Sequence, residues 1–324
     1  MAAIEIRGLT KSYGDVHAVS GVDLTVEQGE ILAFLGPNGA GKTTTIEILE
    51  GFRQRTSGDV FVLGEDPQNA TREWRERIGI VLQESKPDGD LTALETLTLY
   101  AAYYTNPRDP QEVLDVVGLG DAGGQRADKL SGGQQRRLDL ALALIGNPEL
   151  VFLDEPTTGF DPSARRESWE MIENLRDLGV TVLLTTHYMD EAQHLADRIA
   201  VISDGKIVAQ GTAADLAERV SLLTRVSWDE ADAVAAELPA RFAAAIERVV
   251  DAVDGVRLTV ETEDVMGLLE VLLAAARTQG SALTSLEVQR PTLEDTFLRL
   301  IAQESGSQTS DADGGPSAET EVAS

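Results

Sequence analysis

The feature that most constrains this chain is a glycine-rich segment between an apolar run and a helical pattern. The segment Gly36-Pro37-Asn38-Gly39-Ala40-Gly41-Lys42-Thr43 has the spacing G-x-x-x-x-G-K-[ST]. Ile31 to Leu35 before it predict a buried strand, and residues 43–50, ended by Gly51, predict a helix. Glycines let successive N–H groups turn toward a phosphate, and the positive end of the helix dipole adds to the attraction. The segment therefore predicts a phosphate-binding loop.

A second glycine-rich segment, Leu130-Ser131-Gly132-Gly133-Gln134, lies further along the chain. Ser131 is a favoured N-cap residue, and Gln134 to Ile145 has the apolar spacing of a helix. The segment predicts a second helix N-terminus that is able to hold an anion, with a plain capped helix as the alternative.

Two carboxylates follow the apolar run Leu150 to Leu153. Asp154 stands where a nucleotide-binding fold places a Mg²⁺ partner. Glu155, one residue on, is placed to polarise an attacking water as a general base. The alternative is a pair of solvated acids at the end of a strand.

With these segments in this order, residues 4–218 resemble the ATP-binding subunit of an ABC transporter. The resemblance implies an α/β fold of the P-loop NTPase type, with a mostly parallel sheet, an antiparallel β subdomain and a helical subdomain over about 84–133. It implies ATP and Mg²⁺ as cofactors. It also implies a head-to-tail homodimer, in which Ser131 and Gly133 of one subunit contact the γ-phosphate of the ATP that the other subunit holds. Phe160 departs from the smaller aliphatic residue usual in the family, which affects packing at the dimer seam.

The resemblance also implies roles for four residues that carry little information alone. Gln83 matches the glutamine that senses Mg²⁺ and the γ-phosphate, and Asp161 matches the aspartate of the D-loop. His187 matches the switch histidine, with a structural histidine at a strand end as the alternative. Tyr13 matches the aromatic residue that stacks on adenine, with a half-buried tyrosine at a hairpin turn as the alternative.

These expectations give three sets of candidate residues. The nucleotide-binding set is Tyr13, Gly36, Pro37, Asn38, Gly39, Ala40, Gly41, Lys42, Thr43, Thr44, Ser131, Gly132, Gly133, Gln134 and Asp161. The catalytic set is Lys42, Gln83, Glu155 and His187. The metal-binding set is Thr43, Gln83 and Asp154.

The net charge of −28 affects which partners the chain can bind and which salt concentration suits it. No basic stripe is visible, so nucleic acid is not expected as a partner, and an anionic membrane surface would repel the chain. Many acids with few lysines resemble proteins of salt-accumulating halophiles, with an ordinary acidic cytosolic protein as the alternative. The lack of cysteine fits a reducing compartment.

The sequence shows no stretch near the ~20 apolar residues that span a bilayer. The first residues, Met1 to Arg7, lack a signal-peptide pattern. Transport would therefore need separate transmembrane permease subunits, and we expect this chain at the cytoplasmic face of the membrane.

The pattern changes after the predicted ATPase domain, residues 1–219, to that of a small α+β domain over 220–302. Strands are expected over 222–228, 256–261 and 282–288, and helices over 229–238, from Pro239, over 265–279 and over 291–301. Pro291 to Leu298 resembles the ending of exporter-type ATPases of the drug- and antibiotic-resistance group, with a generic regulatory domain as the alternative. Residues 303–324, acidic and rich in serine and glycine, are predicted to be disordered.

These observations favour the ATPase subunit of an ABC exporter. The alternatives are a soluble ABC ATPase of DNA repair or translation, and an importer ATPase with a regulatory C-terminal domain. The ordinary gap between the two glycine-rich segments and the single set of motifs argue against the soluble class.

Overall fold

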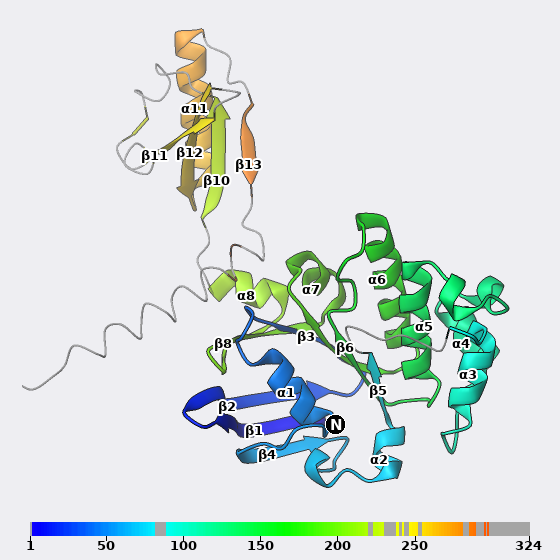
Figure 1. Ribbon diagram of the computed structural model, residues 1–324. Helices are drawn as coiled ribbons and strands as arrows, with labels where there is room; N and C mark the ends of the chain where they lie inside the picture. The colour runs from blue at the N-terminus through cyan, green and yellow to red at the C-terminus, as the bar shows by residue number, and fades with distance from the viewer. Residues whose placement is uncertain are drawn as a thin grey trace, which may run out of the picture. The chain divides into compact units, whose positions relative to one another are not determined.

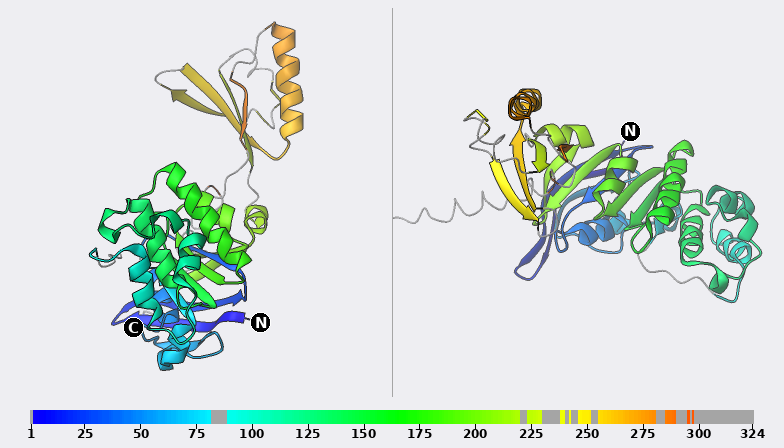
Figure 2. Two further views of the ribbon diagram at one scale, coloured as in Figure 1. Left: turned by 90° about the vertical axis from the view of Figure 1, so that its right-hand side faces the viewer. Right: turned by 90° about the horizontal axis from the view of Figure 1, so that it is seen from above.

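A computed structural model of the chain describes residues 2–81, 89–219, 223–229, 238–239, 242, 246–251, 255–280, 285–289, 295 and 297. The chain divides into two compact units, Met1–Ala213 and Ala214–Ser324 (Figures 1 and 2). Within the described ranges, no helix combines the length and the apolar character needed to cross a bilayer.

The first unit is built on a six-stranded sheet in the order β5-β6-β7-β3-β8-β9. Its strands are β3 (Ile31–Leu35), β5 (Ile78–Val81), β6 (Leu150–Asp154), β7 (Thr181–Thr186), β8 (Arg198–Ser203) and β9 (Lys206–Gly211). All neighbouring pairs are parallel except β8 and β9, which a tight turn with positive φ at Asp204 and Gly205 joins. Figure 1 shows α1 (Lys42–Leu49) on one face of the sheet, and α6 (Pro162–Asp177) and α7 (Met189–Leu195) on the other. With both faces covered, β3 is buried over its whole length.

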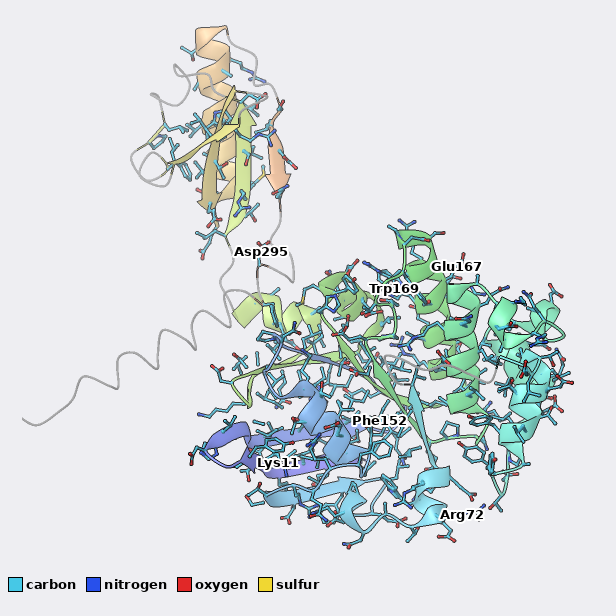
Figure 3. The ribbon with its side chains drawn as sticks, viewed as in Figure 1. Lys11, Arg72, Phe152, Glu167, Trp169 and Asp295 are labelled. Atoms are coloured by element: carbon cyan, nitrogen blue, oxygen red, sulfur yellow. The ribbon has the colours of Figure 1, made fainter. Side chains whose placement is uncertain are left out.

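A three-stranded antiparallel sheet, in the order β2-β1-β4, packs on the other side of α1 (Figure 1). Its strands are β1 (Ala2–Tyr13), β2 (Val16–Glu27) and β4 (Ser57–Val62). In β2, Val22, Leu24 and Val26 are buried, and the residues between them are exposed, as a half-buried strand requires. The core joins both sheets, and Phe152 lies among its side chains (Figure 3).

A group of helices, α3 (Ala93–Ala101), α4 (Pro110–Val116) and α5 (Gly132–Leu144), lies at one side of the first unit (Figure 1). Thr92 and Glu95 form a capping box at the start of α3, and Asp109 caps α4 just before Pro110. The remaining short elements of this unit are η1 (Pro67–Asn69), α2 (Arg72–Glu76), η2 (Gly120–Ala122) and η3 (Ala127–Lys129). The helix α8 (Ala213–Arg219) spans the division between the two units.

The second unit has a four-stranded antiparallel sheet in the order β11-β12-β10-β13. The elements described in this unit are β10 (Thr224–Asp229), β11 (Ile246–Asp251), β12 (Gly255–Thr262), α11 (Val265–Gln279) and β13 (Glu287–Gln289). Leu268 and Leu272 of α11 share a core with Trp228 and Leu258 of the sheet. Asp264 caps α11, and Gly280 ends it in the left-handed conformation that glycine adopts without strain.

The structure confirms the predicted fold class, including the mostly parallel sheet, the antiparallel sheet and the helical group. The helical stretch predicted from Pro239 lies mostly outside the described residues, and Phe242, which is described, is helical. One correction concerns the residues before Val256, where no strand was predicted. Residues 246–251 form β11, which pairs with β12. The strand predicted over 282–288 begins later, at Glu287, and Ser285 and Leu286 precede it. The helix predicted over 229–238 lies outside the described residues except for Asp229, which ends β10, and Leu238. The tail 303–324 lies entirely outside them.

Candidate active site

The predicted site segments meet at one edge of the parallel sheet. In the register of β3 with β7, Leu35 lies beside Thr186, and in that of β6 with β7, Asp154 lies beside Thr185. Because the carboxyl ends of parallel strands lie together, the residues after β3, β6 and β7 converge there. These are the glycine-rich loop, Glu155 and His187.

The loop between β3 and α1 requires glycine at two positions. A Cβ on Gly36 would lie 2.4 Å from the carbonyl oxygen of Ile202, and one on Gly41 would lie 2.4 Å from that of Ala18. Gly41 also has a φ of 103°, in the region that side chains disfavour. It caps α1 without a side-chain hydrogen bond, so the first N–H groups of the helix can serve an anion.

Lys42 folds back on the loop that precedes it. Its Nζ donates to the carbonyl oxygens of Gly36, at 2.7 Å, and Pro37, at 3.2 Å. Burial lowers the pKa of Lys42, and the negative charges of Glu155 and Asp154 act in the opposite direction. A buried ammonium group near two carboxylates can exchange its carbonyl partners for the oxygens of a phosphate.

Glu155 is held in a strained conformation directly after β6. Its φ of 47° is unusual for a residue other than glycine, and its N–H donates to Thr185 O at 3.1 Å. Its carboxylate accepts from Thr158 Oγ1 at 2.9 Å and lies 3.3 Å from Nδ1 of His187. The general base predicted from sequence and the predicted switch histidine are therefore neighbours, with the carboxylate fixed between two side chains.

The side chains predicted to bind a metal offer oxygen atoms. Asp154 Oδ1 accepts from Thr185 Oγ1, and Thr43, in the first turn of α1, is exposed. The described residues contain no cluster of three or more His, Cys, Asp or Glu side chains suited to a metal ion. In nucleotide sites Mg²⁺ binds few protein oxygens, and phosphate and water complete its coordination shell. Thr43 and Asp154 therefore fit that ion. Gln83 lies outside the described residues.

The second glycine-rich segment forms the predicted helix N-terminus. Ser131 and Gln134 make a capping box, in which Ser131 N donates to Gln134 Oε1 at 2.9 Å and Gln134 N donates to Ser131 Oγ at 3.3 Å. In the described part of the chain, no hydrogen bond or ion pair joins Ser131 or Gly133 to the glycine-rich loop.

Tyr13 and Asp161 occupy the ends of other elements. Tyr13 ends β1 at the tight turn to β2, with Lys11 Nζ at 4.8 Å and the Arg53 guanidinium at 5.4 Å from its ring centroid. Tyr13 is 41% exposed, and two cationic groups lie beside its ring, of which Arg53 also pairs with Glu47. Asp161 caps α6 by accepting from the N–H groups of Ser163, at 2.8 Å, and Ala164, at 3.0 Å.

Arg136 is a site residue that the sequence reasoning missed. From α5 it donates to Asp154 O and Pro156 O, both at 3.2 Å, so the helix of the second glycine-rich segment is tied to the end of β6. Burial lowers the pKa of its guanidinium. Its position directly after Gln134 and Gln135 is visible in the sequence, but its carbonyl partners become evident only from the fold.

Comparison with known proteins agrees with this geometry. The family model described as "ABC transporter" matches residues 19–158. The chain is 36% identical over 312 residues to daunorubicin resistance ATP-binding protein DrrA3 of Streptomyces coeruleorubidus, covering 93% of this chain and 96% of that protein. It is 34% identical over 310 residues to linearmycin resistance ATP-binding protein LnrL of Bacillus subtilis, covering 93% and 98%.

The fold also matches solved structures. One is the dimeric structure of a post-hydrolysis state of the ATP-binding cassette MJ0796 bound to ADP and Pi, with a TM-score of 0.57 and 27% identity, covering 64% of this chain and 98% of that one. The relatives along the whole chain and the cassette along the first part agree on one family. The chain therefore belongs to the ABC transporter family, as an ATP-binding and ATP-hydrolysing subunit related to the drug-resistance ATP-binding proteins.

Proposed function

We propose that this ATPase works as a homodimer that powers separate permease subunits of an exporter from the cytoplasmic face of the membrane. The observation that carries the proposal is the convergence of Lys42, Asp154, Glu155 and His187 at one edge of the sheet. The segment Leu130–Gln134 begins a different helix, α5. In the proposed dimer this segment would bind the ATP that the second subunit holds. Two ATP molecules would close the dimer, and hydrolysis would open it.

The loop and the first turn of α1 would hold the phosphates. Residues 36–44 offer N–H groups, Lys42 places its ammonium on the β- and γ-phosphates, and Thr43 and Asp154 hold Mg²⁺. When bound, Mg²⁺ would neutralise charge on the β- and γ-phosphates. We propose that Gln83 also contacts Mg²⁺ and the γ-phosphate, because it matches the glutamine that has this role in the family.

Glu155 would take the proton of the attacking water, and His187 would orient the reacting groups. The hydrogen bond from Thr158 and the contact with His187 support this role, because they fix the carboxylate before substrate arrives. The left-handed backbone of Glu155 also fits strain kept at a functional position.

The dimer would complete each site with residues of the partner. Gly132, Gly133 and the hydroxyl of Ser131 would approach the γ-phosphate of the partner's ATP, with Gln134 capping the helix, and Asp161 would line the seam. Tyr13 would stack on adenine, with the cationic groups of Lys11 and Arg53 beside its ring.

Export is the direction that the named relatives favour, because two of them are resistance proteins along nearly the whole chain. Further relatives are Nod factor export ATP-binding proteins, such as that of Burkholderia lata at 39% identity over 216 residues. We propose residues 1–219 as the ATPase domain, 220–302 as an accessory domain and 303–324 as a disordered tail. The helical part, about 84–133, would contact the permease. Nucleic acid is not proposed as a partner.

Steady-state ATP hydrolysis tests this proposal. Glu155→Gln keeps the shape of the side chain but cannot accept the proton, so hydrolysis should fall by about 10²–10⁴-fold, while ATP affinity stays within about twofold of wild type. Glu170→Gln, an exposed neutralisation on α6, is the matched control and should keep normal turnover. Wild-type turnover in Glu155→Gln would remove Glu155 from the mechanism.

A further inference from the structure

The backbone turn that carries Glu155 is strained and must be held by its surroundings. Glu155 has a φ of 47°. A left-handed backbone costs a residue other than glycine about 1–3 kcal/mol, so it persists only where neighbouring groups fix it. The N–H of Glu155 donates to O and to Oγ1 of Thr185, each at 3.1 Å, which anchors the start of the turn to β7. The carbonyl oxygens of residues 154–156 are reached from a different element.

Arg136 of α5 reaches these three carbonyl oxygens. Its Nη2 donates to Asp154 O at 3.2 Å and to Glu155 O at 3.5 Å, and its Nε donates to Pro156 O at 3.2 Å. One side chain thus contacts the peptide groups on both sides of the strained residue. Because a guanidinium holds its donors in a fixed plane, it sets the direction of these carbonyl groups more strictly than a single donor would.

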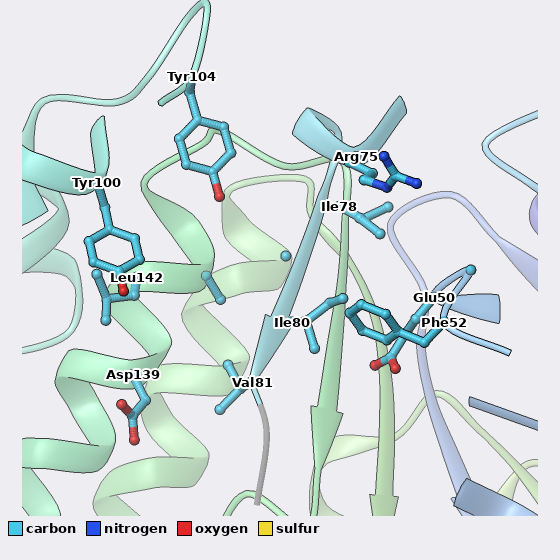
Figure 4. A pocket seen from close by; sticks show the side chains of 13 residues that line it. Glu50, Phe52, Arg75, Ile78, Ile80, Val81, Tyr100, Tyr104, Asp139 and Leu142 are labelled. Atoms are coloured by element: carbon cyan, nitrogen blue, oxygen red, sulfur yellow. The ribbon is translucent and has the colours of Figure 1, made fainter. Parts of the chain in front are cut away.

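The surroundings of the Arg136 side chain are mostly apolar, so water cannot readily take over its contacts. The space beside it is a cavity of about 20 Å³, which has room for about one water molecule. The side chains that line this cavity include Leu140, Leu153 and Ile172. Asp139, shown in Figure 4 where it lines a second cavity beside β5, has its carboxylate 4.0 Å from Nη1 of Arg136. Its negative charge favours the buried cation at this place.

Arg136 stands on the helix that begins at the second glycine-rich segment. Helix α5 is continuous from Gly132 to Leu144, with Ser131 as its N-cap. Arg136 follows Ser131 by five residues, so the two lie roughly 7.5 Å apart along the axis at a rise of about 1.5 Å per residue. A shift of the helix N-terminus would therefore move the guanidinium as well.

We propose that Arg136 is a positioning residue for ATP hydrolysis, which holds the strained turn so that the Glu155 carboxylate faces the attacking water. The inference rests on the proposed function, since it needs Glu155 as the base. The guanidinium acts through the backbone of Glu155 and not on the nucleotide. Because the start of α5 would bind the partner's ATP in the proposed dimer, the position of the base depends on how that segment is seated.

Steady-state hydrolysis and ATP binding by the full chain test this inference. Arg136→Met keeps a long side chain but loses every donor, so kcat should fall by at least about tenfold, which is about 1.4 kcal/mol. The Kd for ATP should stay within about twofold of wild type, because the phosphate-binding loop is unchanged. Arg136→Lys keeps the charge but not the planar group, so its kcat should lie between those of Arg136→Met and wild type.

An unchanged kcat in Arg136→Met, or a loss of ATP affinity equal to the loss of kcat, would overturn the inference. Where Arg136→Met does not fold, the same result is required of Arg136→Lys: a lower kcat at an unchanged Kd for ATP. Wild-type kcat in that variant would then overturn the inference.

The matched control is Arg55→Met. The side chain of Arg55 is 14% exposed, against 15% for Arg136, and its Nε also donates to a backbone carbonyl, that of Gly58, at 2.8 Å. Its partners Gly58 and Asp66 belong to β4 and to the start of η1, so its loss should lower stability but leave kcat within about twofold of wild type. An equal fall of kcat in both variants would assign the effect to general destabilisation and overturn the inference.

A double substitution separates this inference from the proposed function. In single-turnover hydrolysis by Glu155→Gln, adding Arg136→Met should slow the reaction by less than about twofold, because no base is left to be positioned. A further tenfold loss would show that Arg136 acts elsewhere, and the role of Glu155 would stand. Wild-type turnover in Glu155→Gln alone would instead contradict the proposed base, and with it this inference.

Discussion

Glu191, at the residue scale, ties three elements together through one buried carboxyl group. It lies on α7 with no exposed surface, and its Oε1 accepts from Thr157 Oγ1 at 2.8 Å and from Trp169 Nε1 of α6 at 3.2 Å. Thr157 follows Glu155 by two residues, so the turn that carries the proposed base rests on this group. Burial raises the pKa of Glu191, and hydrogen bonds from Thr186, Thr157 and Trp169 oppose that rise.

Removing this carboxyl group should destabilise the protein. Glu191→Ala leaves the donors Thr186, Thr157 and Trp169 without this acceptor, so the free energy of unfolding should fall by about 2–4 kcal/mol. Glu170→Ala, on the exposed side of α6, should change it by less than about 0.5 kcal/mol. Urea denaturation measures both, and an equal effect of the two substitutions would contradict the structural role of Glu191.

The raised pKa of Glu191 gives a pH dependence of known sign. The unfolded carboxyl group loses its proton with a pKa of 4.5, whereas the folded protein still holds that proton at higher pH. The wild type therefore loses stability as the pH rises from 4.5 toward the folded pKa. Glutamine does not titrate. Glu191→Gln should therefore gain stability relative to wild type as the pH rises above about 4.5, and a relative loss would show that the pKa shift has the opposite direction.

The sequence predicts hydrogen bonds between neighbouring residues better than hydrogen bonds between residues that are far apart in the chain. The capping box at Ser131 and Gln134 is predictable because both partners lie within four residues of one helix start. Arg136 and Glu191 were not predicted as important residues. Their hydrogen-bond partners lie on other elements, and ordinary helix patterns do not indicate which carbonyl or hydroxyl group a side chain will meet.

At the scale of elements, β3 and α11 were predicted from neighbouring residues, whereas β11 was not. The bounds of β3 and α11 follow from an apolar run before glycine, and from a helical apolar period between Asp264 and Gly280. β11 was missed, because Ile246 to Asp251 carries charges inside the strand and is stabilised by its pairing with β12. Its long-range partner decides its structure, and short windows of sequence do not contain it.

Truncation tests the proposal that the ATPase domain ends near residue 219. The second unit has its own sheet and its own core around Trp228 and Leu268, and the phosphate-binding loop, Glu155 and His187 all precede it. A chain ending at Arg219 should fold and bind ATP with an affinity within about threefold of the full chain. Isothermal titration calorimetry measures this, and a folded truncated protein that no longer binds ATP would place part of the site in the second unit.

At the scale of the whole molecule, the net charge of −28 makes electrostatic repulsion important for stability and association. Acids outnumber basic residues 55 to 27, and the lysines are only Lys11, Lys42, Lys86, Lys129 and Lys206. Such a surface repels itself at low ionic strength, which works against a compact state. The same repulsion opposes association of two copies, so salt should also favour the dimer.

Salt dependence of the melting temperature tests the proposed halophilic character. The Debye length shrinks to about 3 Å at 1 M salt, which screens repulsion between neighbouring carboxylates. The melting temperature should rise steeply between about 0.1 M and 2 M KCl, as scanning calorimetry would show. A flat or falling curve would reject the halophilic proposal, and the ATPase function would stand without it.

The most direct test of the central proposal is the oligomeric state of Glu155→Gln with Mg-ATP. This variant should bind ATP and cleave it very slowly, so Lys42 of one subunit and Ser131 of the other keep holding an intact γ-phosphate. Light scattering after size-exclusion chromatography should then show a dimer with Mg-ATP and a monomer with Mg-ADP. A variant that binds Mg-ATP and remains a monomer, at low and at high salt, would contradict the shared site.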